Sequence, residues 1–450
     1  MATVTDTAVR HRLKGWWAGL DEPVSIAPLV TLRVVLGGLL LFSTARFWAL
    51  GWIDDHYIRP GFHFHYYGFE WVRLLPPSGL YAVHALLMLS SLLVMLGLCY
   101  RLAALAQFLL FTYTELLDLT YYLNHYYFVS IACAMLVVAP AHRAVSLDVW
   151  RNPALRLTHV PRWTVGMFKL QLALVYGYAG LWKINSDWLL HALPLKIWLP
   201  AQDRLPLIGP LFRFTETAYV FSWLGMLYDA TIPFWLSWST TRPFAYVVVI
   251  VFHVVTGMLF QIGVFPAVMI GATLVFFSEK WHRRIWRIPN GESHAANTEW
   301  RMPIAKSVLV VHFLFQILFP WRYLLYPGNV FWTEEGYRFS WRVMLMEKAG
   351  TAQFYVRDGR TGREGLVVNS EFLNPHQEKQ MSMQPDMILQ FAHFLKAHYE
   401  KKGVADPVVR AEVYVTLNGR PSRLLIDPAV DLTLLRDGWG RKAWILASER

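Results

Sequence analysis

Long apolar stretches alternate with short polar ones over the first 320 residues of the chain. Each apolar stretch approaches the roughly 20 residues that an α-helix needs to cross the hydrocarbon core of a bilayer. The predicted spans are 27–50, 81–100, 102–119, 124–140, 164–183, 218–238, 243–260, 263–278 and 304–320. The pattern therefore predicts a polytopic α-helical membrane protein with about 8–9 spans.

After Pro320 the hydropathy falls and the period changes. Residues 352–368 alternate apolar and polar positions around the turn sequence DGRTG, which predicts a β-hairpin. Residues 385–402 have apolar side chains at helical spacing, and residues 411–427 predict a second hairpin that turns at Asn418-Gly419. We predict a small α+β domain that follows the membrane part without a flexible linker.

Three segments follow from this reading: an N-terminal segment (1–26), a transmembrane domain (27–320) and the α+β domain (321–450). The composition agrees, because 55% of the residues are hydrophobic and only 16% are charged, against about a quarter in soluble proteins. The net charge of +11 raises the question of a nucleic-acid partner. Most of the cations lie in short loops between spans, however, so membrane topology explains them and no nucleic acid is predicted.

Lys and Arg are distributed unevenly between the two alternating sets of loops. Fourteen lie in the set that contains the N-terminus, loop 141–163 and loop 279–303, and six lie in the opposite set. The positive-inside rule places the richer set in the cytoplasm. With an odd number of spans, the C-terminal α+β domain is then extracytoplasmic.

Several polar residues are predicted to gather near the outer leaflet, on the side of the C-terminal domain. Asn124 and His125 open the fourth span, Lys183 closes the fifth and Gln261 closes the seventh. Ionisable residues at membrane depth are costly, so each is a hypothesis of function. Two further ionisable residues lie deeper, namely Asp229 and His253.

Each of these residues also has a structural interpretation. Lys183 can be an interfacial lysine whose amine reaches the headgroups, and as a base it would have to be desolvated. His125 can be an ordinary interfacial histidine, and His253 a hydrogen-bonded core histidine. Asp229 is expected to pair with a cation or to cap a break in its span. The residue pattern alone leaves these alternatives open.

The pair His63 and His65 in the first outer loop has a spacing that metal ligands can show. We prefer loop packing, since no carboxylate or cysteine cluster completes a ligand set, and no metal is predicted. The chain also lacks a nucleophile elbow, a P-loop, an HEXXH motif and a dinucleotide fingerprint. The motifs therefore indicate a site between membrane and lumen without naming a reaction.

Several stretches, taken in order, resemble the vitamin K-dependent gamma-glutamyl carboxylase family and its bacterial relatives with HTTM membrane domains. In the membrane part they are FHFHYYGFEWV (62–72), LNHYYFVSIACAML (123–136), VYGYAGLWKINSDWL (175–189), YDATIPFWLSWSTTR (228–242) and FHVVTGMLFQIGVFP (252–266). In the C-terminal part they are FWTEEGYRFSWRVML (331–345), YVRDGRTG (355–362) and the segment from Asp427 to Asp431. The resemblance covers nearly the whole chain.

The resemblance implies a membrane-embedded site that deprotonates a vitamin K hydroquinone. It assigns the catalytic base to Lys183, and it implies that Asn124 and His125 hold the quinol oxygens. We expect Tyr126, Gln261 and His253 to complete the cofactor site. In the family mechanism, O2 converts the quinolate into a strong base, which removes a proton from the gamma carbon of a glutamate. CO2 then adds to the carbanion, and the vitamin leaves as its epoxide.

The same resemblance implies the partners: a glutamate-containing peptide or protein, the lipid bilayer, an isoprenoid quinol and a reductase that recycles the epoxide. For contact with the substrate carboxylate we predict Arg322, Trp332 and Arg338, which lie in the segment joining the two parts.

Two departures from the family bear on the substrate. The chain is much shorter than animal carboxylases, and Tyr323 stands where relatives often carry a histidine. The compact layout resembles bacterial members, so we expect a bacterial inner membrane and possible use of menaquinol. The alternatives are quinol epoxidation without glutamate carboxylation, and a non-enzymatic HTTM protein that binds a peptide.

Overall fold

The computed structural model describes residues 19–288 and 303–448, and a helix occupies each of the nine predicted spans. These helices are α2 (Ala27–Ala49), α3 (Pro77–Leu96), α4 (Tyr100–Leu116), α5 (Asn124–Val138), α7 (Arg162–Trp182), α10 (Thr215–Ser237), α11 (Arg242–Leu259), α12 (Phe265–Thr273) and α14 (Pro303–Leu318). The helical membrane part and the small sheet-containing C-terminal region agree with the predicted fold class.

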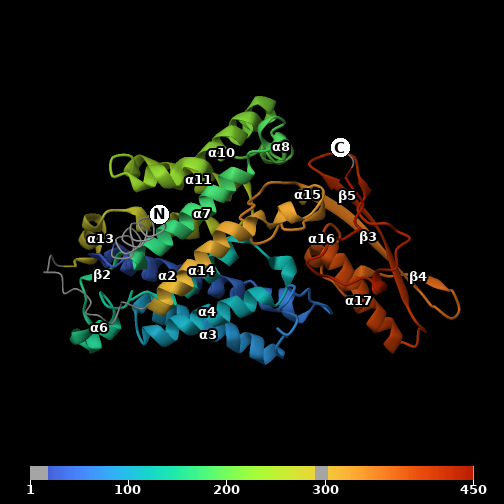
Figure 1. The fold of residues 1–450 in the computed structure, drawn as a ribbon, viewed down its shortest axis with the longest axis horizontal. Coiled ribbons are helices and arrows are strands. Elements are labelled where there is room, and N and C mark those ends of the chain that lie inside the picture. The colour runs from blue at the N-terminus through green and yellow to red at the C-terminus, as the bar shows by residue number, and fades with distance from the viewer. Residues whose placement is uncertain (1–18, 289–302, 449–450) are drawn as a thin grey trace, which may run out of the picture.

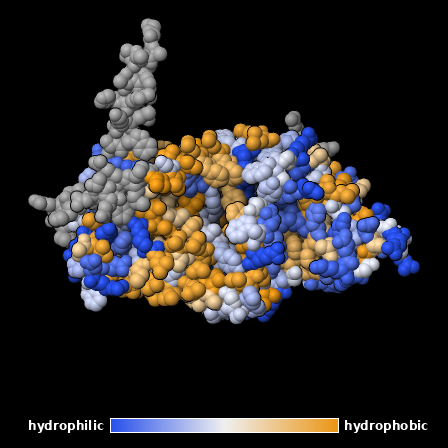
Figure 2. Space-filling model, turned by 60° about the horizontal axis from the view of Figure 1, so that its bottom comes forward, coloured by the Kyte–Doolittle hydropathy of each residue, from blue (hydrophilic) through white to orange (hydrophobic). Residues whose placement is uncertain are grey.

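The predicted number of spans is not confirmed. Four segments of the described chain are long and apolar enough to cross a membrane, namely Ala27–Ala49, Pro77–Leu96, Arg242–Leu259 and Ile304–Leu325. Two shorter apolar helices, Asn124–Val138 and Phe265–Phe276, accompany them. Figure 2 shows hydrophobic side chains gathered over this helical part and hydrophilic ones over the C-terminal domain.

The orientation also stays a prediction. Four of the cations that the charge comparison used, Arg10, Arg12, Lys14 and Arg301, lie outside the described residues. The same holds for residues 1–18 of the predicted N-terminal segment.

Helix α7 runs through the middle of the membrane part, with α10 and α11 on one side and α14, α4 and α3 on the other (Figure 1). Shorter elements connect or cap these helices. They are β1 (Pro23–Ser25), α6 (Leu147–Arg151), β2 (His159–Pro161), α8 (Ser186–Leu189), α9 (Leu195–Trp198), α13 (Glu279–Trp286) and α15 (Val330–Thr333). Strands β1 and β2 pair antiparallel and so join the start of α2 to the start of α7.

The C-terminal domain is built on a four-stranded antiparallel sheet in the order β4-β3-β5-β6. Its elements are β3 (Lys348–Arg357), β4 (Glu364–Leu366), α16 (Pro375–Met381), α17 (Pro385–Lys401), β5 (Val408–Leu417) and β6 (Arg423–Leu424). Both predicted hairpins and the predicted helix are confirmed. Asn418 and Gly419 both have positive φ, as a tight two-residue hairpin turn requires.

The central pairing of β3 with β5 joins two hairpins that are far apart in sequence, from Lys348 opposite Leu417 to Arg357 opposite Val408. Local turn signals do not specify such a pairing. Helix α17 lies against the sheet, and its side chains Phe391 and Leu395 are fully buried in the core of the domain.

The outer loop after α2 is part of the C-terminal domain's core rather than a free loop. Phe64 is fully buried and lies in the same hydrophobic cluster as Phe391. The backbone of His65 exchanges hydrogen bonds with the side chain of Gln390, and Nδ1 of His63 lies 3.1 Å from Asp118. The loop is therefore packed into the domain core and holds the two parts together.

A second contact between the two parts lies directly after α7. Arg420, beyond the turn of the second hairpin, donates to both oxygens of Asp187 at 2.8 and 2.6 Å, and Asn418 donates to Oδ2 at 2.8 Å. The next residue, Trp188, donates its indole N–H to the carbonyl of Ser222 on α10. The short segment beyond Lys183 is therefore fixed on one side by the C-terminal domain and on the other by α10.

This contact predicts a pH-dependent stability. The hydrogen bond from Arg420 lowers the pKa of Asp187 below its ordinary value. A carboxyl whose folded pKa is depressed stabilises the fold above its unfolded pKa of about 3.9, and the stabilisation is lost as the pH falls further. Arg420→Ala should therefore lower Tm at pH 7, and the difference from wild type should shrink on acidification. The control is Arg357→Ala, which removes an exposed arginine of the same domain. An Arg420→Ala variant whose Tm falls equally far below wild type at pH 7 and below about pH 3.9 would contradict the prediction.

Candidate functional site

Lys183 is buried at the end of α7, with 5% of its surface exposed. Its Nζ donates to Oδ2 of Asp229 at 2.7 Å and to the carbonyl of Ala179 at 3.2 Å. The same amine lies 5.2 Å from the centre of the Trp188 ring. The interpretation of Lys183 as an interfacial lysine reaching the headgroups is not supported, and the expected pairing of Asp229 with a cation is confirmed.

A close helix crossing makes this ion pair possible. A Cβ added at Gly180 would lie 2.4 Å from the backbone nitrogen of Ala230, so no other residue fits there without moving α10. Gly180 precedes Lys183 by one turn, and Ala230 follows Asp229 directly. The missing side chain therefore brings the two helices close enough for the amine to reach the carboxylate. Pro233 lies one turn further along α10, where it leaves the carbonyl of Asp229 without its usual helical donor.

Lys183 and Asp229 lie in the wall of a cavity of about 880 Å³ between α7, α10, α11 and α12. Most of the lining is aliphatic or aromatic. Seven apolar lining side chains are also exposed on the outside of α10 and α11, so the cavity opens between these helices toward the lipid; they are Leu224, Leu227, Trp235, Phe244, Val247, Val248 and Val251. The arrangement suits a large apolar ligand that enters from the bilayer with a polar group directed at the ion pair.

His253 of α11 lies in the same wall and is buried. Its Nε2 lies 2.9 Å from the hydroxyl of Tyr176, whereas its Nδ1 is buried without a hydrogen-bond partner in the described chain. Tyr228 donates in turn to Tyr176 at 3.5 Å. The interpretation of His253 as a hydrogen-bonded core histidine is thus correct for Nε2, whereas Nδ1 is buried without a partner in the described chain.

His125 does not line this cavity. It is buried near the start of α5, its ring centre lies 5.0 Å from that of Phe265, and its Nε2 has no partner in the described chain. Phe265 is a lining residue and also contacts His253, with ring centres 5.5 Å apart. One aromatic ring therefore separates His125 from the cavity that contains Lys183.

The other predicted cofactor residues also lie outside the cavity wall. Asn124 donates to the carbonyl of Arg342 at 2.9 Å and accepts from the hydroxyl of Tyr122, so its amide ties α5 to the segment before β3. The ring of Tyr126 packs at a tilt against that of His125, with ring centres 4.4 Å apart. Gln261 is exposed in the turn between α11 and α12. Their roles in cofactor binding stay predictions.

None of the three predicted substrate residues lines the cavity that contains Lys183. Arg322 and Arg338 line a second cavity, between α4, α5, α14 and the C-terminal domain, which shares no lining residue with the first. Trp332 is buried in the domain core and donates its indole N–H to the carbonyl of Leu446 at 2.8 Å. The structure thus separates the predicted base from the predicted carboxylate contacts.

Two matches to protein-family models bear on what this arrangement is. The HTTM domain model matches residues 21–281, more than half of the chain, and the model described as the vitamin K-dependent gamma-carboxylase lumenal domain matches residues 301–450. The chain belongs to the vitamin K-dependent gamma-carboxylase family. No solved structure matches it. The family assignment confirms the resemblance, establishes a multi-pass membrane protein, and fits an extracytoplasmic C-terminal domain.

In this carboxylase-family chain, the residues of the Lys183 cavity fit a hydroquinone. Its volume and apolar lining accommodate a naphthoquinol ring with a prenyl tail, and the opening toward lipid gives such a ligand a way in. Lys183 and His253 both line the cavity, and Nδ1 of His253 has no hydrogen-bond partner in the described chain. Among the described residues no group of His, Cys, Asp or Glu side chains could hold a metal ion.

Three residues around the site were not predicted from the sequence: Tyr176, Phe265 and Arg342. Tyr176 lies seven residues before Lys183, a spacing that places both on one face of a helix, so this signal was available. Arg342 is 2% exposed and its guanidinium lies 4.1 Å from the centre of the Trp182 ring and 4.5 Å from that of Tyr323. No periodic pattern marks Arg342, because it lies in an irregular segment.

Proposed function

We propose that this protein is an integral-membrane enzyme that oxygenates a vitamin K hydroquinone, or menaquinol, to its epoxide and couples the reaction to CO2 addition on peptide glutamate. The observation that carries the proposal is the buried Lys183–Asp229 pair in the wall of a lipid-accessible apolar cavity. When bound, the hydroquinone supplies the reducing chemistry toward O2.

In this proposal Nζ of Lys183 accepts a proton from a quinol hydroxyl. An amine that already carries a proton cannot accept another one, so Lys183 needs a partner that takes its proton, and Asp229 is that partner. Both partners are buried, with side-chain exposures of 6% and 8%, so the carboxylate of Asp229 is placed to take the proton of the paired amine when the quinol binds. His253 orients the ring through Nδ1, while Tyr176 fixes the imidazole from the other side.

Exclusion of water is the second task of the site. A strong base formed during oxygenation would be quenched by bulk water, and the apolar walls from α10 and α11 keep water out. His125, behind Phe265, would reach a quinol oxygen only if that ring turned aside, and Asn124 would act through the position of α5.

A second candidate is quinol epoxidation without carboxylation. It is favoured by one observation: among the described residues that line the cavity, Lys183 is the only Lys or Arg that could hold a glutamate carboxylate. The predicted contacts Arg322 and Arg338 line the other cavity. A non-enzymatic peptide-binding role is the remaining alternative, and it assigns no chemistry to the buried ion pair.

One assay separates the three candidates. Purified protein is incubated with vitamin K hydroquinone, O2, labelled bicarbonate and a glutamate-containing peptide, and epoxide and fixed label are measured separately. The proposal expects both products. Epoxide without fixed label would support the second candidate, and the absence of both would contradict either enzymatic function.

A further inference from the structure

The second cavity, of about 970 Å³, has no part in the proposed reaction. Its apolar part follows α5 and α14 along their whole length, from Val138 and Ile304 at one end to Phe319 at the other. Helix α14 is exposed along this groove, with Val308 at 62% and Phe315 at 45%. The groove is therefore open to the bilayer and has the length of a hydrocarbon chain rather than of a folded peptide.

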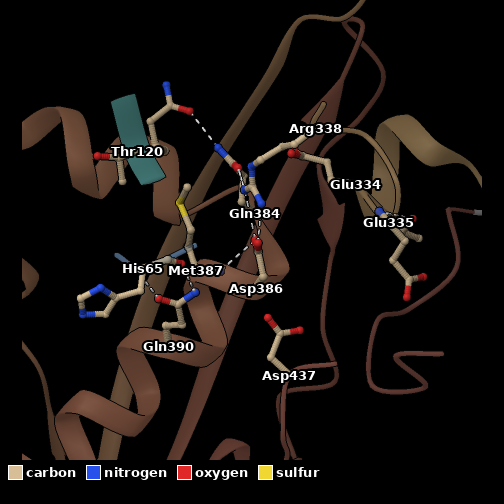
Figure 3. A network of polar contacts seen from close by, with 12 residues as sticks. His65, Thr120, Glu334, Glu335, Arg338, Gln384, Asp386, Met387, Gln390 and Asp437 are labelled. Carbon is tan, nitrogen blue, oxygen red and sulfur yellow. Dashed lines mark hydrogen bonds and ion pairs between the residues drawn. The ribbon is translucent and has the colours of Figure 1, made fainter. Parts of the chain in front are cut away.

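The mouth of the groove, beneath the C-terminal domain, is highly charged. Three ion pairs occupy most of its charges: Arg338 with Asp386, Lys442 with Asp437 at 2.8 Å, and Lys348 with Glu334 at 2.8 Å. Figure 3 shows Asp386, Asp437, Glu334 and Glu335 from this region close together. The interaction between Arg338 and Asp386 is strong. Burial alone would raise the pKa of Asp386, but Arg338 outweighs this effect, and the pKa is lowered to about 2.

Three charged lining residues form no ion pair among the described residues: Glu115 of α4, and Arg322 and Glu335 beneath the C-terminal domain. Arg322 donates only to the backbone carbonyls of Phe319 and Arg338, and its guanidinium lies 3.9 Å from the centre of the Phe319 ring. Glu335 is 8% exposed, and its Oε1 is buried without a hydrogen-bond partner. Burial raises the pKa of Glu335, and this effect outweighs the opposing influence of the nearby Lys442 and Arg441.

One further residue relates the two charges beneath the C-terminal domain. Tyr326 lies in the lining of the same groove and is within electrostatic reach of both Arg322 and Glu335. A cation and an anion, each unpaired and both at the polar end of an apolar groove, are complementary to a zwitterion that carries a hydrocarbon chain.

We propose that this groove binds a phospholipid with a zwitterionic, amine-bearing headgroup. The acyl chains lie between α4, α5 and α14, the phosphate contacts Arg322, and the ammonium donates to Glu335. The bound lipid fills the gap beside α14 and joins that helix to the rest of the bundle. This site is separate from the Lys183 cavity and does not depend on the proposed function.

Native mass spectrometry of the full-length protein, released from bilayers with equal amounts of three phospholipids, tests the proposal. We expect phosphatidylethanolamine to be retained with about tenfold higher affinity than phosphatidylglycerol. The reason is that phosphatidylglycerol has no ammonium group. Phosphatidylcholine should be retained less than phosphatidylethanolamine, since its quaternary ammonium has no N–H to donate to Glu335.

Variants distinguish the headgroup contacts from the groove itself. Glu335→Gln should remove the preference for phosphatidylethanolamine, and Arg322→Gln should lower retention of all three lipids. Ala134→Trp, which fills the apolar part, should abolish retention, whereas Glu364→Gln, on β4 outside the groove, should change nothing.

Three results would overturn the inference: equal retention of phosphatidylglycerol by the wild type, unchanged retention in Ala134→Trp, or displacement of the lipid by a glutamate peptide or by menaquinol. Lipid retention is measured without quinol. A protein that retains the lipid but forms no epoxide would therefore keep this inference and remove only the proposed function.

Discussion

Lys183→Ala is expected to lower the rate of vitamin K epoxide formation by at least about 100-fold, the usual range for loss of a general base. The reason is positional: among the described residues that line the cavity, Lys183 is the only amine, and it lies where a quinol hydroxyl would be placed. Fixed label should fall in the same proportion if carboxylation is coupled to oxygenation. The measurement is epoxide formation per mole of purified, folded enzyme.

Lys169→Ala is the matched control, because it removes an amine from the same helix at a distance from the cavity lining. Its epoxidation rate should stay close to wild type. A Lys183→Ala enzyme as active as this control would show that the base lies elsewhere.

The second large effect concerns stability. Asp229→Asn and Lys183→Met each leave one buried charge without its partner, and removing one member of a buried pair typically costs about 3–5 kcal/mol. The double variant Lys183→Met/Asp229→Asn should lose much less than the sum, since no uncompensated charge remains. It should be folded and still inactive, which separates the chemical role of Lys183 from its structural role.

Unfolding of the four proteins, measured under one set of conditions, gives the coupling energy of the pair. As a control, the same cycle on Arg410 and Glu364, a half-exposed pair in the C-terminal domain, should give a coupling below about 1 kcal/mol. A coupling for Lys183 and Asp229 as small as this control would mean that the two charges do not depend on one another.

The sequence predicted the positions of the helices and of the hairpins well, although not a confirmed number of spans, because helices and hairpins follow from local periodicity and turn residues. It also indicated that Lys183 and Asp229 matter, since ionisable residues at membrane depth are rare. It did not predict that they pair, because the contact depends on a helix crossing at Gly180 that no local pattern encodes.

The separation of the predicted site residues was equally beyond the sequence. The predicted base and the predicted carboxylate contacts lie at the same end of the membrane part; they are Lys183, Arg322 and Arg338. Their similar depth in the membrane was the only reason that the sequence offered for grouping them into one site. Helix α7 and the packed aromatic residues around Trp182 divide this end into two cavities. Which residues face which cavity is a property of packing around the bundle axis, and span assignments say nothing about it.

The most direct test of the central claim is to locate the bound quinol. A menaquinone analogue with a photoreactive group on its ring is reduced, bound to the purified protein and cross-linked, and the modified residues are found by peptide mass spectrometry. If the quinol binds in the Lys183 cavity, we expect labels on α7, α10 and α11 around Lys183, His253 and Asp229. Unmodified vitamin K hydroquinone should suppress this labelling. Labels confined to α4 and α14, in the second cavity, would contradict this prediction.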